Sequence, residues 1–169
     1  DPVHREAAEQ VMSILPAAAF SRICTSREAE YIKYGSNSWF YFKILFINAL
    51  YDLAEHDGCD YDIIRDALAA DPRIGPSHLM PVHKSGTLGS DNYHLLSDKE
   101  KKTKHGGRGA GGHCFIKDFA AFSRLYRDTL PHDTLGIEML RALESKNIAL
   151  LKGSNKDVDL LKDVYGNSV

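Results

Sequence analysis

The fold is decided by AEYIKYGSNSWFYFKILFINALYDLAEH, residues 29–56. Apolar side chains recur every three or four positions through this stretch, which contains no proline, and the spacing predicts one long α-helix. Ser26 is placed to cap its start, and Gly58 lies just past its end, where a left-handed residue often terminates a helix. At ~1.5 Å per residue the helix would be roughly 40 Å long. We therefore expect it to pack on several sides.

Helical spacing of apolar residues recurs on both sides of this stretch, and the chain shows no sustained alternation of apolar and polar residues. Further helices are predicted over residues 3–15, 60–70, 114–130 and 134–151, with a final turn or two over 157–164. Residues 71–113 are rich in glycine with little apolar periodicity, and predict an extended loop region whose glycine run follows polar loop rather than a strand. We expect an all-α fold, with residues 1–169 forming a single domain.

The composition is that of an ordinary globular protein: 43% of the 169 residues are hydrophobic and 26% are charged. The net charge of -2 gives no general attraction to nucleic acid, and no apolar run reaches the length of a membrane span. Three cysteines, Cys24, Cys59 and Cys114, are an odd and widely spaced set. That pattern favours free thiols in a reducing compartment, so we expect a cytoplasmic location.

The stretch GRGAGGHCFIKD, residues 107–118, leads through four glycines to Cys114. A thiol at the start of a helix is stabilised as thiolate by the positive end of the helix dipole, and Lys117 adds positive charge one turn later. Cys114 is therefore a candidate nucleophile, although a cysteine in a helix is more often structural. Zinc binding with His105 and His113 is a weaker alternative, because the paired ligand spacings of a structural zinc site are absent.

Lys33 and Asn37 stand four residues apart on one face of the long helix. The same stripe continues through Phe40, Tyr41, Ile44 and Asn48 and becomes mostly apolar. A cation and an amide at the head of an apolar stripe suggest two groups aimed into a cleft. A solvated edge near the helix end explains the spacing equally well.

Three motifs occur in a characteristic order. AEYIKYGSNSWFYFKILFIN (29–48), DPRIGPSHL (71–79) and GGHCFIKD (111–118) resemble three segments of the UDP-glucose/GDP-mannose dehydrogenases. The resemblance is to their central helical domain only. It implies NAD-dependent oxidation of the C6 hydroxyl of a UDP- or GDP-sugar to a carboxylate. The flanking NAD-binding and nucleotide-sugar-binding domains of the family are absent from this chain, so NAD would be bound by another domain.

The resemblance implies a role for each matching residue. Cys114 would attack the C6 aldehyde, and the resulting thiohemiacetal would be oxidised to a thioester that water cleaves. Lys33 would bind substrate and supply positive charge where an oxyanion develops, with a hydrogen bond from Asn37 beside it. Asp118 would position the water or move a proton.

Further contacts are implied for substrate and partner. Arg73 would reach the sugar hydroxyls from a neighbouring subunit, and the backbone of Gly111 and Gly112 would approach the substrate closely. Lys117 is a weak candidate for a cofactor contact. A homodimer is expected because the long helix carries many apolar residues on several faces: Trp39, Phe40, Phe42, Leu45, Phe46 and Leu50.

Several positions depart from the family pattern. Ala110 stands where the family has an aromatic residue before the Gly-Gly pair, His78 where it has Phe, and Ala49 where it commonly has Glu. Residues 82–108 form an inserted loop. Two functions therefore remain open: the catalytic central portion of a nucleotide-sugar 6-dehydrogenase, or a non-catalytic helical dimerisation module derived from it. By either reading, the chain by itself should not reduce NAD.

Overall fold

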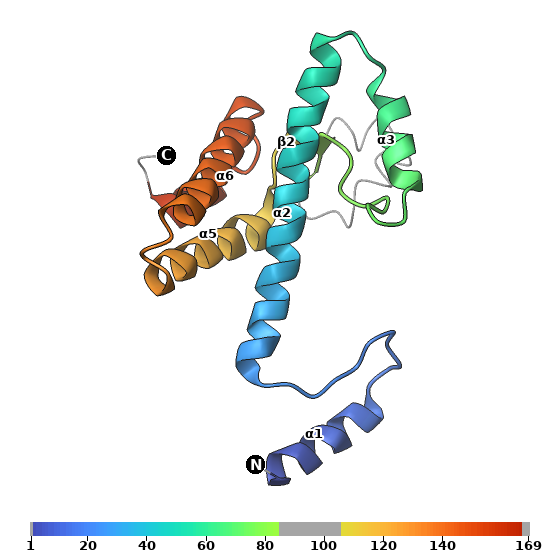
Figure 1. Ribbon diagram of the computed structural model, residues 1–169, viewed down its shortest axis with the longest axis vertical. Helices are drawn as coiled ribbons and strands as arrows, with labels where there is room; N and C mark the ends of the chain where they lie inside the picture. Colours follow the sequence, from blue (N-terminus) through green and yellow to red (C-terminus); the bar gives the residue numbers. More distant parts are fainter. Residues whose placement is uncertain (1, 85–105, 167–169) are drawn as a thin grey trace. The chain divides into compact units, whose positions relative to one another are not determined.

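The computed structural model describes residues 2–84 and 106–166 of the chain. They fall into two units, residues 1–33 and residues 34–169. The long helix α2, Ser26–His56, runs from the first unit into the second (Figure 1). The expected long helix is confirmed, and it begins three residues earlier than its apolar pattern.

The start of α2 is set by a capping box on Thr25, not by Ser26 as expected. The Glu28 amide donates to Thr25 Oγ1 at 3.2 Å, and the Thr25 amide donates back to Glu28 Oε2 at 2.7 Å. This reciprocal pair satisfies two of the amides that a helix start leaves without partners. At the other end Gly58 has a φ of 69°, so the predicted left-handed terminator is confirmed.

The remaining helices follow the sequence pattern closely. The first unit contains α1, Pro2–Ile14, and side chains of residues 4–33 are exposed or half-buried. The second unit adds α3, Tyr61–Ala70, α5, Gly112–Thr129, α6, Thr134–Gly153, and α7, Val158–Tyr165. The all-α expectation is confirmed.

The loop region between α3 and α5 contains one element that was not expected. Strands β1, Val82–His83, and β2, Gly107–Arg108, pair antiparallel, with Val82 opposite Arg108. The glycine run therefore continues from a short strand, and the expectation that it follows only polar loop is wrong. Most of the expected insertion, residues 85–105, lies outside the described residues.

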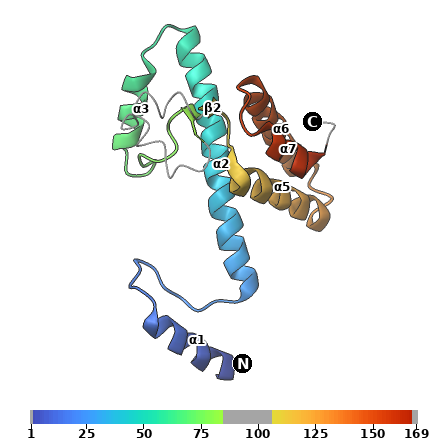
Figure 2. The ribbon, with the colours of Figure 1, turned by 180° about the vertical axis from the view of Figure 1, so that it is seen from behind.

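Within the second unit, α3 lies on one side of α2, and α5 and α6 lie on the other (Figures 1 and 2). On the α5 side, Tyr41 stacks on Phe119 with ring centroids 3.9 Å apart and planes 4° from parallel. On the α3 side, Ile47 packs with Tyr61 and Leu79. The stripe predicted from Tyr41 through Asn48 is therefore a core face, which holds α5 in place beside α2.

The apolar residues of α2 divide between core and surface. Leu45 is 3% exposed and belongs to the core, so it cannot contribute to a dimer surface as expected. Phe40 stacks on the ring of His78 within the unit. Trp39, Phe42 and Phe46 remain exposed.

Candidate active site at the start of helix α5

Cys114 lies in the first turn of α5 and is exposed. The turn is entered through Gly111 in an extended conformation and Gly112 with a φ of 82°. A residue with a side chain rarely adopts that second conformation, so glycine is needed at position 112 to begin the helix there. The thiol consequently sits at the positive end of the helix dipole.

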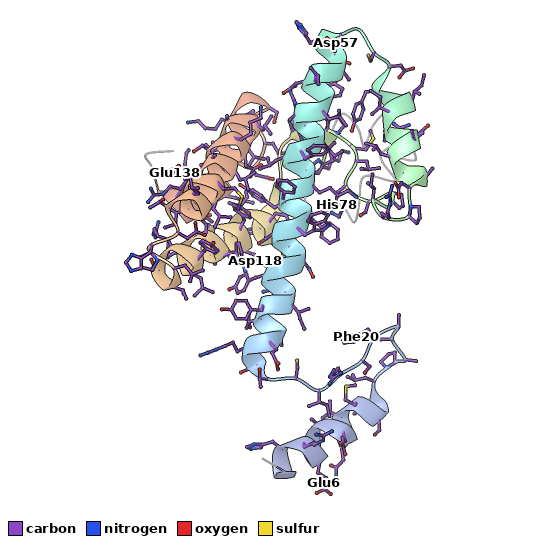
Figure 3. The ribbon with its side chains drawn as sticks, in the orientation of Figure 1. Glu6, Phe20, Asp57, His78, Asp118 and Glu138 are labelled. Atoms are coloured by element: carbon purple, nitrogen blue, oxygen red, sulfur yellow. The ribbon has the colours of Figure 1, made fainter. Side chains whose placement is uncertain are left out.

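Asp118 lies one turn after Cys114 on the same face of α5. Its side chain is 1% exposed, and two donors from different elements compensate its charge. Asn37 Nδ2 on α2 donates to Asp118 Oδ2 at 2.6 Å, and Lys117 Nζ lies 2.8 Å from Asp118 Oδ1. Figure 3 shows Asp118 where α5 comes against α2. A buried carboxylate is stable only with such partners, so the side chains of Asn37, Lys117 and Asp118 form one polar cluster.

Lys117 supplies the positive charge of this polar cluster, and its side chain is exposed. The hydrogen bond to Asp118 and the charge of that carboxylate raise the pKa of Lys117, and the charge of a Cys114 thiolate acts in the same direction. The ammonium group therefore stays protonated at neutral pH and lies within electrostatic reach of the thiol. Such a neighbour favours the nucleophilic form of a cysteine.

An aromatic group borders the same end of α5. The ring of His78 stacks on Phe40 of α2 at 4.3 Å between centroids and meets Phe115 edge-on at 5.7 Å. Phe115 directly follows Cys114, so these contacts bring the 71–80 segment beside the thiol-bearing turn. His78 thus packs through its ring as an aromatic residue would.

The segment before Cys114 is fastened to α2 by Arg108. Its Nε donates to Asn48 Oδ1 at 2.8 Å, and its Nη2 lies 2.6 Å from Asp52 Oδ1. The guanidinium also lies 5.5 Å from the ring centroid of Tyr51. This arginine therefore anchors the glycine run to the C-terminal half of the long helix.

The same segment is pressed against α6. The side-chain amide of Asn147 bonds both backbone groups of Ala110, accepting from its N–H at 2.7 Å and donating to its C=O at 3.0 Å. A Cβ added to Gly109, which has a φ of 88°, would lie 2.9 Å from Asn147 Oδ1. The close approach to α6 thus accounts for the glycine at this position.

The predicted site residues are only partly brought together. Asn37, Lys117 and Asp118 meet beside Cys114. Arg73 has a side chain 87% exposed and pairs with Asp71 at 2.6 Å within its own turn. Lys33 lies one turn before Asn37 on α2 and belongs to the first unit.

Sequence reasoning missed four residues that hold the site: Arg108, Asn147, Lys156 and Asp157. Arg108 was hidden in the glycine run, and the other three follow Cys114 by more than 30 residues. No local pattern links residues so far apart in the chain.

Cofactors and metals find no obvious site among the described residues. Residues 2–84 and 106–166 contain no group of three His, Cys, Asp or Glu side chains that could hold a metal ion, and His105 lies outside them. The two strands that these ranges contain have two residues each, so the parallel sheet that usually cradles a dinucleotide is not formed by them. None of the described helices combines the length and the hydropathy needed to cross a bilayer.

Comparison with known proteins gives a consistent result. Residues 27–103 match the model of the UDP-glucose/GDP-mannose dehydrogenase family, central domain. The UDP-glucose 6-dehydrogenase of Rhizobium meliloti (strain 1021) is 32% identical over 110 residues, covering 65% of this chain and 19% of the relative. That of Pseudomonas aeruginosa is 29% identical over 121 residues, covering 72% of this chain and 20% of the relative. The chain spans about a fifth of the length of these relatives, and the family-model match ends before Cys114.

Proposed function

The chain is related to the UDP-glucose/GDP-mannose dehydrogenase family through its central domain, and from this premise we propose that it supplies the catalytic thiol of an NAD-dependent nucleotide-sugar 6-dehydrogenase. The observation that carries the proposal is the buried carboxylate of Asp118, which Asn37 and Lys117 hold one turn from Cys114. A helix used only for support gains little from burying a carboxylate at such a cost in desolvation.

The chemistry assigned to this chain is covalent capture and hydrolysis. The Cys114 thiolate attacks the C6 aldehyde of the sugar, forming a carbon–sulfur bond and leaving negative charge on the carbonyl oxygen. Covalent attachment keeps the reactive aldehyde from leaving between two oxidations. Asp118 orients the water that later cleaves the thioester, and its contact with Asn37 fixes the carboxylate for that task. The oxidations need NAD, and the described residues do not form the parallel sheet that usually binds a dinucleotide.

The substrate and assembly follow from the same premise. We assign a UDP- or GDP-sugar as substrate, with Lys33 and Arg73 as contacts and Gly111 and Gly112 as the backbone beside the sugar. The exposed Arg73 is suited to reach a site on a second copy of the chain. A cytoplasmic setting, where thiols stay reduced, belongs to this proposal.

A second function is favoured by the exposed apolar face of α2, formed by Trp39, Phe42, Phe46 and Leu53. Such a face suits a helical dimerisation module that retains the family fold without its chemistry. The two functions differ in what they require of Cys114. Only the catalytic function requires a reactive thiol at that position.

Brief labelling with iodoacetamide at neutral pH, followed by peptide mapping, tests the proposal on the chain itself. All three cysteines are exposed, so accessibility alone predicts similar labelling. We expect Cys114 to label faster than Cys24 and Cys59, and the C6-aldehyde form of UDP-glucose to slow labelling of Cys114 only. Cys59 is the internal control, because it is also exposed and lies just past the end of α2, away from the start of α5. Equal labelling of the three cysteines would contradict the catalytic function and leave the dimerisation module.

A further inference from the structure

The turn between α6 and α7, residues 154–157, has an unusual backbone. Asn155 and Asp157 have φ values of 51° and 53°, in the left-handed region that residues with side chains seldom occupy. Two such residues in one four-residue turn carry a conformational cost that the surrounding contacts must offset. The contacts that offset this cost are those that the turn makes with other parts of the chain.

Three of its four residues bind the backbone of the segment that leads to Cys114. Ser154 Oγ accepts from the Arg108 amide at 3.0 Å. Lys156 Nζ, 3% exposed as a residue, donates to the carbonyl oxygens of Gly107 at 3.3 Å and Gly109 at 3.0 Å. Asp157 Oδ2 accepts from the amide of Gly112 at 2.8 Å. These bonds satisfy backbone groups that a glycine-rich segment cannot satisfy by itself.

The contact with Gly112 occupies a special place. Gly112 is the first residue of α5, so its amide has no partner within the helix, and Cys114 follows two residues later. A carboxylate that accepts from this amide makes a charge-assisted hydrogen bond at the positive end of the helix. The bond fixes the residue at which α5 begins. It thereby fixes the direction in which the Cys114 side chain leaves the backbone.

Helix α7 fixes the position of Asp157 through its first turn and through its packing on α5 and α6. The Leu161 amide donates to the Asp157 backbone carbonyl at 3.1 Å, so the turn leads directly into α7. Leu161 is 1% exposed and packs with Ile116 of α5 and Leu151 of α6. The turn and α5 are consequently held in one packed unit.

We propose that Asp157 is a positioning residue for Cys114, acting through the hydrogen bond from the Gly112 amide to its carboxylate. The inference rests on the proposed function, since positioning matters only for a thiol that reacts. It extends the site to a residue 43 positions beyond the thiol, outside the segment matched by the family model.

Two substitutions at Asp157 separate the carboxylate from the turn. Asp157→Gly removes the side chain while allowing the left-handed conformation, and Asp157→Asn keeps an acceptor oxygen without the charge. Asn155→Gly is the matched control, because it makes the same change at the other left-handed residue of the turn. Circular dichroism establishes that each variant is folded.

The first measurement is hydrogen exchange of the Gly112 amide by NMR. We expect exchange to become about tenfold faster in Asp157→Gly. Exchange should stay near the wild-type rate in Asp157→Asn and Asn155→Gly. Unchanged exchange of the Gly112 amide in a folded Asp157→Gly variant would overturn the inference.

The second measurement is the labelling rate of Cys114 relative to Cys59. The faster labelling of Cys114 relative to Cys59 should be lost in Asp157→Gly. It should be kept or increased in Asp157→Asn, because asparagine retains an acceptor oxygen for the Gly112 amide. If the negative charge itself were what mattered, Asp157→Asn would lose the faster labelling as well. An advantage that persists in Asp157→Gly would also overturn the inference. If wild-type Cys114 has no advantage, the proposed function fails, and exchange of the Gly112 amide alone decides whether Asp157 fixes the start of α5.

Discussion

At the scale of single residues, the contact between His83 and Lys156 shows how burial lowers the pKa of basic side chains that pack beside the glycine run. Lys156 Nζ lies 3.1 Å from His83 Nε2. Burial, followed by the charge of Lys156 and then that of His78, lowers the pKa of His83 to about 3. Burial also lowers the pKa of Lys156 to about 8. The histidine is therefore neutral in the folded chain and accepts a proton readily only after unfolding.

This difference predicts how stability depends on pH. Between pH 6.5 and about 3 the unfolded chain binds a proton at His83 that the folded chain does not, so acidification through this window favours unfolding. Replacing the histidine in His83→Gln should reduce the slope of unfolding free energy against pH by up to about 1.4 kcal/mol per pH unit. Urea titrations at several pH values measure the slope.

The exposed His132 supplies the control for that experiment, since His132→Gln removes a histidine without changing a buried contact. Its slope should match that of the wild type. Equal slopes for His83→Gln and the wild type would contradict burial of a neutral His83. Lys156 acts in the same direction at higher pH, from about 8 toward its ordinary 10.5, where stability should rise with pH.

At the scale of elements, the approach of the glycine run to α6 can be tested at Gly109. Gly109→Ala would place a Cβ 2.9 Å from Asn147 Oδ1 and 3.1 Å from Leu150 Cβ, with a φ of 88°. We expect the free energy of unfolding to fall by about 2–4 kcal/mol, because overpacking against α6 adds to the backbone strain. Urea unfolding measures the loss.

Gly58→Ala separates the two causes. Gly58 has a φ of 69° and no atom within 4 Å of the added Cβ, so only backbone strain remains there. We expect the free energy of unfolding of this variant to fall by about 1 kcal/mol. Similar losses for the two variants would mean that the contact with α6 contributes nothing to the requirement for glycine at position 109.

The elements also show which features the sequence can predict. Apolar periodicity is a local signal, so α2 and α5 were predicted almost to their ends, and the capping box from Thr25 to Glu28 was readable although it was overlooked. The pairing of β1 with β2 was missed because two-residue strands have no periodicity. The bond between Asp157 and Gly112 joins residues 45 apart, and nothing near either residue indicates the other.

At the scale of the whole molecule, the exposed face of α2 predicts self-association. Trp39, Phe42, Phe46 and Leu53 recur at helical spacing and are 59%, 41%, 54% and 58% exposed. A contiguous apolar face of this kind usually lies against another protein surface. A second copy of the chain can supply the same face, as a two-fold interface requires.

Trp39→Glu should therefore convert a dimer into a monomer of 18.8 kDa, because a charge would be buried in the interface. Sedimentation equilibrium measures the mass. Ile63→Glu is the control, since Ile63 is an exposed apolar residue of α3, 69% exposed, and should leave the dimer intact. A wild-type chain that sediments as a monomer would contradict this use of α2.

The pairing of β1 with β2 has an evolutionary consequence. Because His83 lies opposite Gly107, two residues that are separated by 23 residues in the sequence are neighbours in the structure. A segment with adjacent ends can be lengthened, shortened or exchanged at little entropic cost, about 0.6 kcal/mol for each doubling of length. On this ground we expect changes of length between these two residues to be tolerated more readily than changes within the helix that bears the thiol. The pairing thus makes this position a natural point at which descendants of one ancestral domain diverge.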